Sequence, residues 1–254
     1  MAVGEPVRAL EPDVLTAFEL AFREGEVRRR EPLRSSWDVR FESVEPVREF
    51  SWRKGALGFA GWYYSATVRD HVGYESWLER DRLVLLDRDP EVIGIASQPF
   101  WLHWRDTSGN RRHAPDFFVR LADGRARVVD VRAEDDMDEA TREAFAATAD
   151  ACRAVGWEFE WAKRPAPVFM ANVRWLARYR RTRCGRPSEV ADRLLEVFHE
   201  PKGLWEGAEL VGDRLQVLPV LFHLLWSGAL ATDLVGGLLE TKSLVWTEAS
   251  GWAG

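Results

Sequence analysis

Apolar residues dominate the chain between positions 113 and 132, broken by one short polar turn. The pattern predicts two strands, 113–121 and 125–132, joined by Ala122-Asp123-Gly124, a three-residue turn whose glycine accepts a left-handed backbone. Shorter apolar runs predict further strands at 92–96, 100–104 and 157–163. The centre of the chain is therefore predicted to be rich in short strands.

Two other stretches carry apolar residues at helical spacing between charged ones. They predict a helix at 74–86, stopped by Asp89-Pro90, and a helix at 138–155, with Gly156 in the position of a cap. A shorter helix is predicted at 167–178. Alternating strands and helices predict an α/β fold in which helices flank a mixed sheet.

The N-terminal region is predicted to hold one helix and two strand segments. Residues 14–27 have a helix-like pattern, so 1–34 is interpreted as a helical arm. Alternation at 37–52 predicts a strand or hairpin, and the aromatic, β-branched segment 62–68 predicts another strand after a loop at 55–61.

The composition changes at an arginine-rich segment without acidic residues, which is interpreted as a linker. Its arginines are Arg174, Arg178, Arg180, Arg181, Arg183 and Arg186. The segments predicted beyond it are helices at 189–198, 204–211 and 215–227, then strands at 229–234 and 243–247. Three helices followed by a β-wing predict a small winged-helix-like domain at 181–254, which leaves 35–180 as the main α/β domain.

Composition excludes several classes of protein. The net charge of −6 gives no overall basic signature, so the distribution of charge must decide whether nucleic acid binds. Cys152 and Cys184 are too few for a disulfide framework or a cysteine-rich zinc site. No apolar run is long enough to span a bilayer and the N-terminus has no signal-peptide pattern, so we expect a cytoplasmic, nucleoid-associated bacterial protein that does not bind membranes.

The predicted hairpin carries the most specific chemistry. Asp116 and Asp130 are each seven residues from Asp123, so they are predicted to face each other across the ladder, with Arg132 on the same face. Val129 and Val131 are predicted to point the other way, into the core. Two facing carboxylates repel each other, and Mg²⁺ or Mn²⁺ would compensate them and could activate water beside a phosphoryl group. The alternative interpretation is that Asp130 pairs with Arg132 or Arg120 on a solvated face.

The sequence Pro115-Asp116, followed by Asp130-Val131-Arg132, resembles the PD-(D/E)xK signature of the restriction-endonuclease-like superfamily. Together with Glu75, Glu79, Asp89-Pro-Glu and Gln98-Pro99, it is similar to the N-terminal catalytic domain of TnsA-type transposase endonucleases. The resemblance covers about residues 35–180, and the predicted winged-helix-like outline fits the second domain of that family. It implies a restriction-endonuclease-like fold.

The resemblance also implies roles for individual residues. Asp116, Asp130 and Glu79 would be catalytic metal ligands, with the backbone carbonyl of Val131 as a further ligand, and Arg132 would stand at the position of the catalytic lysine. Glu75 could replace Glu79, because the two are one helical turn apart, or it could be a surface charge.

Further residues are assigned with alternatives. His113 is either an assisting residue or a hydrogen-bonded residue at the rim of the site, and Gln98 either closes a strand or touches the site. Because arginine is always protonated, Arg132 cannot act as a general base and is expected to orient water or donate to phosphate.

The resemblance predicts a Mg²⁺-dependent endodeoxyribonuclease that cuts the 5′ strands at transposon ends. Its expected partners are double-stranded DNA, a DDE-type transposase and an AAA+ regulator. The arginines from Arg174 to Arg186 are the predicted DNA contacts, or else a solvated hinge. The mostly apolar helix at 215–227 suits partner docking better than base reading. Two alternative functions are a non-catalytic DNA-binding or assembly protein on the same fold and a restriction or defence nuclease.

Overall fold

The computed structural model of the protein describes residues 17–50, 59–107 and 109–247. The chain forms two compact units, the first containing residues up to 63 together with 71–79 and 91–163. The second contains 64–70, 80–90 and the residues from 164 onward. Helix α3 (Trp77–Arg88) therefore contributes its first turn to one unit and the remainder to the other.

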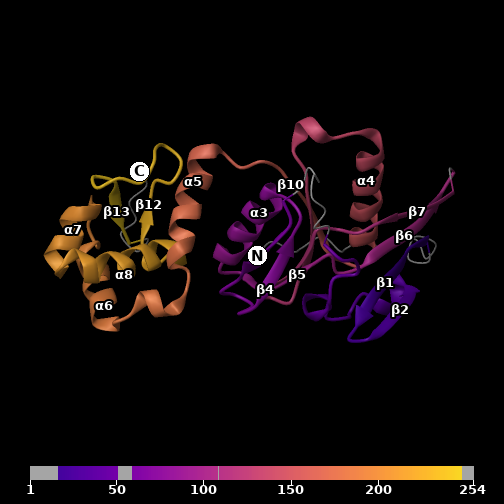
Figure 1. The fold of residues 1–254 in the computed structure, drawn as a ribbon, viewed down its shortest axis with the longest axis horizontal. Helices are drawn as coiled ribbons and strands as arrows, with labels where there is room; N and C mark the ends of the chain where they lie inside the picture. The colour runs from indigo at the N-terminus through magenta and orange to yellow at the C-terminus, as the bar shows by residue number, and fades with distance from the viewer. Residues whose placement is uncertain (1–16, 51–58, 108, 248–254) are drawn as a thin grey trace, which may run out of the picture. The chain divides into compact units, whose positions relative to one another are not determined.

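The first unit contains a four-stranded antiparallel sheet in the order β2-β1-β6-β7. Its strands are β1 (Glu19–Glu24), β2 (Val27–Pro32), β6 (Trp101–Asp106) and β7 (Gly109–His113). Strands far apart in the sequence thus lie side by side, as the indigo and magenta strands of Figure 1 show. Leu20 and Phe22 of β1 are buried on one face, which leaves the alternate residues on the other.

A second four-stranded sheet, in the order β10-β9-β8-β5, carries the predicted hairpin. Its strands are β5 (Val92–Ser97), β8 (Phe117–Leu121), β9 (Ala126–Val131) and β10 (Glu158–Ala162). Strand β10 pairs with β9 in parallel, whereas the other pairs are antiparallel. This mixed sheet and its helices confirm the predicted α/β fold.

Helix α4 (Glu139–Ala154) has a defined beginning and end. The Asp138 carboxylate accepts a hydrogen bond from the Thr141 backbone N–H at 2.8 Å, which satisfies one unpaired donor of the first turn. Gly156, at φ +75°, lies just beyond the helix in the left-handed conformation that favours glycine. Ala151 and Cys152 are buried in a core cluster that both sheets share.

Aromatic rings fill the centre of that core. Phe41, from the short helix η1 (Phe41–Ser43), is fully buried and lies 4.9 Å from Phe100 and 5.7 Å from Trp157, measured between ring centroids. Burying one such side chain contributes about 1.5–3 kcal/mol. The smaller elements of this part of the chain are α2 (Leu33–Ser36), β3 (Gly61–Tyr64), β4 (His71–Tyr74) and η2 (Glu134–Asp136).

The second unit is mainly helical, with a three-stranded sheet in the order β11-β13-β12. Its helices are α5 (Pro167–Leu176), η3 (Ala177–Tyr179), η4 (Thr182–Gly185), α6 (Ser188–Val197), α7 (Leu204–Val211) and α8 (Arg214–Ser227). Its strands are β11 (Lys202–Gly203), β12 (Ala231–Thr232) and β13 (Leu244–Trp246). Within the described residues, no helix is both long and apolar enough to cross a membrane.

Three sequence-based predictions about the termini and boundaries are wrong. The helix predicted at 14–27 is, over its described part, mainly the β1–β2 hairpin, because β1 gains backbone partners from β6. The described part of 37–52 contains no strand, only a turn, several bends, the helix η1 and a single bridge from Glu45 to Arg23. The segment interpreted as a linker folds into the end of α5, η3 and η4 within the second compact unit.

Candidate active site

The β8–β9 hairpin has the register that the sequence predicts. Phe117 pairs with Val129 and Phe118 with Val128, so the next residues outward, Asp116 and Asp130, stand opposite each other. Gly124 adopts φ +89° in the turn, as the three-residue loop requires. The two carboxylates therefore share one face at the open end of the hairpin.

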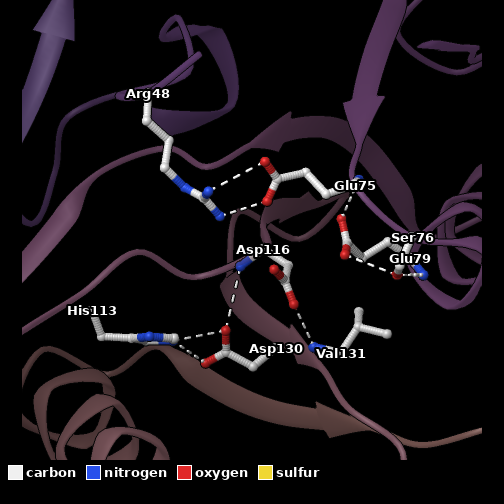
Figure 2. Close-up of polar contacts among 8 residues, drawn as sticks. All are labelled: Arg48, Glu75, Ser76, Glu79, His113, Asp116, Asp130 and Val131. Carbon is white, nitrogen blue, oxygen red and sulfur yellow. Dashed lines mark hydrogen bonds and ion pairs between the residues drawn. The ribbon is translucent and has the colours of Figure 1, made fainter. Parts of the chain in front are cut away.

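Hydrogen bonds hold the two aspartates in place. An oxygen of Asp116 accepts from the Val131 backbone N–H at 2.7 Å, and the Asp116 backbone N–H donates to Asp130 at 3.3 Å (Figure 2). Among the described residues, nothing donates to the second oxygen of Asp116, Oδ1. That oxygen remains available to a ligand.

The aspartates extend a buried row of the sheet. On alternate positions they continue the face of Phe118 and Val128, both fully buried in the core cluster. The Asp130 side chain is only 1% exposed, whereas Asp116 is partly exposed. Val131, predicted to point into the core, is partly exposed and lines the cavity described below.

His113 is the partner of Asp130. Its Nε2 lies 2.9 Å and 3.0 Å from the two Asp130 oxygens, so a hydrogen on that nitrogen is shared by both. The alternative pairing of Asp130 with Arg120 or Arg132 is wrong, because Arg120 donates to Glu42 and Arg132 to Thr141. His113 ends β7, so it reaches Asp130 from the other sheet.

Glu79 lies in the first turn of α3 and caps that turn. Its carboxylate accepts from the Glu75 backbone N–H at 2.7 Å and from the Ser76 hydroxyl at 2.9 Å, while its own N–H donates to Ser76 Oγ. Glu75 precedes the helix, so the prediction that Glu75 and Glu79 share a helical face is wrong.

Arg48 holds the carboxylate of Glu75 in place. Its two terminal nitrogens donate to the two oxygens of Glu75 at 3.2 Å and 2.6 Å, a bidentate pair (Figure 2). This engagement makes Glu75 a less available ligand than Asp116, whose second oxygen has no described partner.

These side chains line one cavity of about 440 Å³, which lies within the first unit. Its acidic residues are Glu75, Glu79, Asp116, Asp130 and Asp138, and its basic residues are Arg48, Arg112, His113 and Arg132. The structure therefore brings together the predicted Glu79, Asp116, Asp130 and Arg132, together with Glu75 and His113.

The acidic cluster raises the pKa values of two of its members. Burial raises the pKa of Asp116 well above its usual range, and the neighbouring carboxylates of Glu79 and Asp130 raise it further. Burial is also the main cause of the raised pKa of Glu79, against the lowering effect of its bonds from Glu75 and Ser76. Negative charge at Asp116 is thus incompletely compensated by the protein itself.

The donor set fits a hard divalent cation by its chemistry. Asp116, Asp130 and Glu79 offer carboxylate oxygens, which Mg²⁺ and Mn²⁺ prefer. As the side chains stand, no three His, Cys, Asp or Glu residues of the described chain surround a common metal position. Mg²⁺ usually needs only one or two carboxylates and keeps several waters, so Asp116 and Asp130 suffice in number, and Glu79 would join them on leaving its cap.

Arg132 and Gln98 have different surroundings. Arg132 is exposed and donates to the Thr141 hydroxyl at 3.5 Å, at the edge of the cavity. Gln98 is buried at φ +48° and does not line the cavity; its backbone N–H donates to the Asp116 carbonyl at 2.9 Å. Gln98 thereby closes the strand beside Asp116, the first of its two predicted roles.

The predicted DNA contacts in the arginine-rich segment are partly engaged inside the second unit. Arg174 forms a bidentate pair with the buried Asp81, with one distance of 2.7 Å. Arg180 donates to the Tyr64 carbonyl at 3.0 Å and to the Ala177 carbonyl at 2.7 Å. Arg174 is exposed despite this pair, and the other exposed members are Arg178, Arg181, Arg183 and Arg186.

Sequence reasoning missed several residues of the cavity, above all Arg48 and Arg112. Arg48 meets Glu75 across 27 positions of the chain, a separation that no local pattern reveals. Arg112 lies 4.4 Å from the centre of the Trp101 ring, and only the pairing of β6 with β7 places it there. The run Arg111-Arg112-His113 was the available signal for it.

The mixed β10-β9-β8-β5 sheet with its flanking helices agrees with a restriction-endonuclease-like fold. Residues 89–163 match the family model described as TnsA-like endonuclease N terminal, which covers the β5–β10 region with Asp116, Asp130 and Arg132. Over this region the chain is similar to TnsA-like endonucleases. No match was found among curated proteins.

Proposed function

We propose that the protein is a divalent-metal-dependent endonuclease subunit of the TnsA type. It would hydrolyse phosphodiester bonds on the 5′ strands of transposon ends, in company with a partner transposase. One observation carries the proposal: Asp116 and Asp130 face each other in a cavity that Glu79 also lines, and both aspartates lie in the region that matches TnsA-like endonucleases.

The residues of the cavity have complementary tasks in this reaction. Asp116, Asp130 and Glu79 would hold Mg²⁺ or Mn²⁺, which when bound supplies water activation and charge neutralisation. The Val131 carbonyl is proposed as a further ligand. His113 holds the Asp130 carboxylate in one orientation through its bifurcated contact.

The cationic side chains suit a phosphate oxygen. Arg112 and Arg132 line the cavity and are exposed, so both can donate to a phosphodiester without leaving a buried partner unpaired. A guanidinium group donates hydrogen bonds and does not serve as a general base, so Arg132 is proposed as a donor to phosphate or water.

The second unit is proposed as the partner-docking module. Helices α6, α7 and α8 precede strands β12 and β13, and β11 lies between α6 and α7. Strand β13 pairs with both β11 and β12, an arrangement that supports a winged-helix-like fold. Six residues of α8 are buried and Leu215 is exposed, so this helix offers few groups that read base edges. A DDE-type transposase and an AAA+ regulator are the proposed partners.

The test is cleavage of supercoiled plasmid carrying transposon ends, with the chain alone and with its partner transposase. Wild type should nick DNA in Mg²⁺ or Mn²⁺ and not in EDTA, and Asp116→Ala should abolish nicking while DNA binding persists. If wild type never cuts under any of these conditions and Asp116→Ala binds DNA equally well, the nuclease proposal fails.

A second candidate is a non-catalytic DNA-binding or assembly protein on the same fold. The observation that favours it is Arg132, which replaces the usual lysine and contacts Thr141 at the edge of the cavity rather than an aspartate. It predicts that partner-dependent transposition survives Asp116→Ala. A restriction or defence nuclease would have the same core, and its cleavage would not depend on a transposase.

A further inference from the structure

One face of the β2-β1-β6-β7 sheet is lined with arginines. Residues paired across antiparallel strands point to the same face, and the register pairs Arg23 with Arg28, Ala21 with Arg30, and His103 with Arg112. The pairing of Glu19 with His103 and Ala21 with Trp101 joins β1 to β6. We call this surface the arginine face; its arginines are Arg23, Arg28, Arg30, Arg105 and Arg112.

Acidic residues compensate this face only in part. Glu19 pairs with Arg30 at 2.6 Å, and Glu45 pairs with Arg23 at 3.2 Å. Among the residues that the structure describes, Arg28, Arg105 and Arg112 have no acidic partner, and all three are exposed. The face is therefore positive in a chain whose net charge is −6.

The facing arginines destabilise the sheet, and the need to keep an edge strand from aggregating does not account for them. Arg23 and Arg28 stand directly opposite each other, and like charges at such positions destabilise a sheet. Charges on an edge strand discourage aggregation, but here the cations extend from β2 across to β7. The pKa of His103 is lowered by burial and then by Arg30 and Arg112, which reflects the positive field across the central strands.

The arginine face leads into the cavity that holds the carboxylates. Trp101 and Arg112 belong to both surfaces. A neighbouring hollow of about 620 Å³ is lined by Arg23, Arg28 and Arg48, and Arg48 also lines the cavity. Arg23, Arg28 and Arg48 thus connect the arginine face with the acidic pocket through a hollow that Glu49 also lines.

We propose that the arginine face binds the phosphate backbone of duplex DNA and directs one strand into the carboxylate cavity. This proposal rests on the nuclease function proposed above and names the surface that holds its substrate. Four strands at about 4.8 Å spacing span about 14 Å, comparable with the major-groove width of about 12 Å. Exposed arginines without acidic partners release counterions on binding phosphate, so affinity should be salt-dependent and independent of sequence.

The test measures binding of a short fluorescent duplex of arbitrary sequence to the full chain in EDTA, where no cutting occurs. Arg28→Gln/Arg105→Gln removes two cations that have no described partner. Arg153→Gln/Arg193→Gln makes the same change in net charge on exposed residues of other elements, helices α4 and α6. Arg28→Lys/Arg105→Lys keeps the charge, and circular dichroism verifies that every variant is folded.

The proposal predicts that Arg28→Gln/Arg105→Gln weakens binding about tenfold at low salt and reduces the salt slope by about 2. The control pair and the lysine pair should stay within about threefold of wild type. Equal binding by the glutamine pair and the control pair would overturn the proposal, as would a wild type that does not bind the duplex.

Cleavage is measured separately, so the two proposals can fail independently. Loss of binding in the glutamine pair with no cutting by wild type would support the arginine face and refute the nuclease. If wild type cuts DNA and the glutamine pair binds as well as wild type, the nuclease proposal is supported and the arginine face is refuted.

Discussion

Replacing Asp116 by asparagine should stabilise the metal-free protein. The carboxylate is partly buried beside Glu79 and Asp130, and its pKa is raised well above the ordinary value of 3.8. Asparagine removes the charge and keeps an oxygen for the Val131 N–H, which donates to Asp116 at 2.7 Å. A charged group left without compensation at a partly buried site costs about 1–3 kcal/mol, so the gain should be of that size near pH 7.

The sign of the pH dependence follows from the direction of that shift. A carboxyl whose pKa is raised on folding favours the folded state while it is protonated, and that contribution is lost as the pH rises through the folded pKa. The advantage of Asp116→Asn should therefore be small near pH 4 and grow toward neutral pH.

Thermal unfolding in EDTA measures the effect, at about 2–4 °C per kcal/mol for a chain of this size. Asp123→Asn is the matched control, because it removes a carboxylate from the same hairpin that is exposed and paired with Arg125. This variant should be as stable as wild type or slightly less stable. Mn²⁺ at about 100 times its Kd should stabilise wild type by about 2.7 kcal/mol and the Asp116→Asn variant far less. An Asp116→Asn variant less stable than wild type in EDTA would refute the argument that this charge is uncompensated.

Three further predictions concern other residues of the two units. Arg132→Lys should retain metal-dependent nicking whereas Arg132→Ala should lower its rate about 100-fold, with unfolding changed by under about 0.5 kcal/mol in both; equal rates would refute a role for this cation. Ser76→Ala should cost about 1 kcal/mol through the α3 cap and leave nicking intact, whereas Glu79→Gln should abolish nicking; identical effects on nicking would mean that Glu79 acts only as a cap. Arg174→Ala should destabilise the protein by about 1–3 kcal/mol, because it leaves Asp81 buried and unpaired; an unchanged melting temperature would contradict this.

The hairpin and the later helices could be predicted because their signals are local. Gly124 and Asp123 mark the turn, and counting outward from them places Asp116 opposite Asp130. Helix α4 begins after its cap residue, Asp138, and ends before Gly156, as the local sequence predicts. Such features need only the neighbouring sequence.

The N-terminal strands and half of the cavity depend on pairing across long stretches of chain. Residues 19–24 form a strand because β6, some 80 positions later, supplies hydrogen bonds, and tertiary pairing overrides local preference there. Arg48 is placed by Glu75, and His113 by Asp130. The arginine face likewise exists only once four separate strands are in register.

The location of a divalent cation tests the central claim most directly. Crystals of the full chain soaked in Mn²⁺ would reveal the ion by its anomalous scattering. The proposed function predicts a peak in contact with both Asp116 and Asp130, absent from crystals of Asp116→Asn. A wild-type structure with full Mn²⁺ access and no peak between these carboxylates would contradict it.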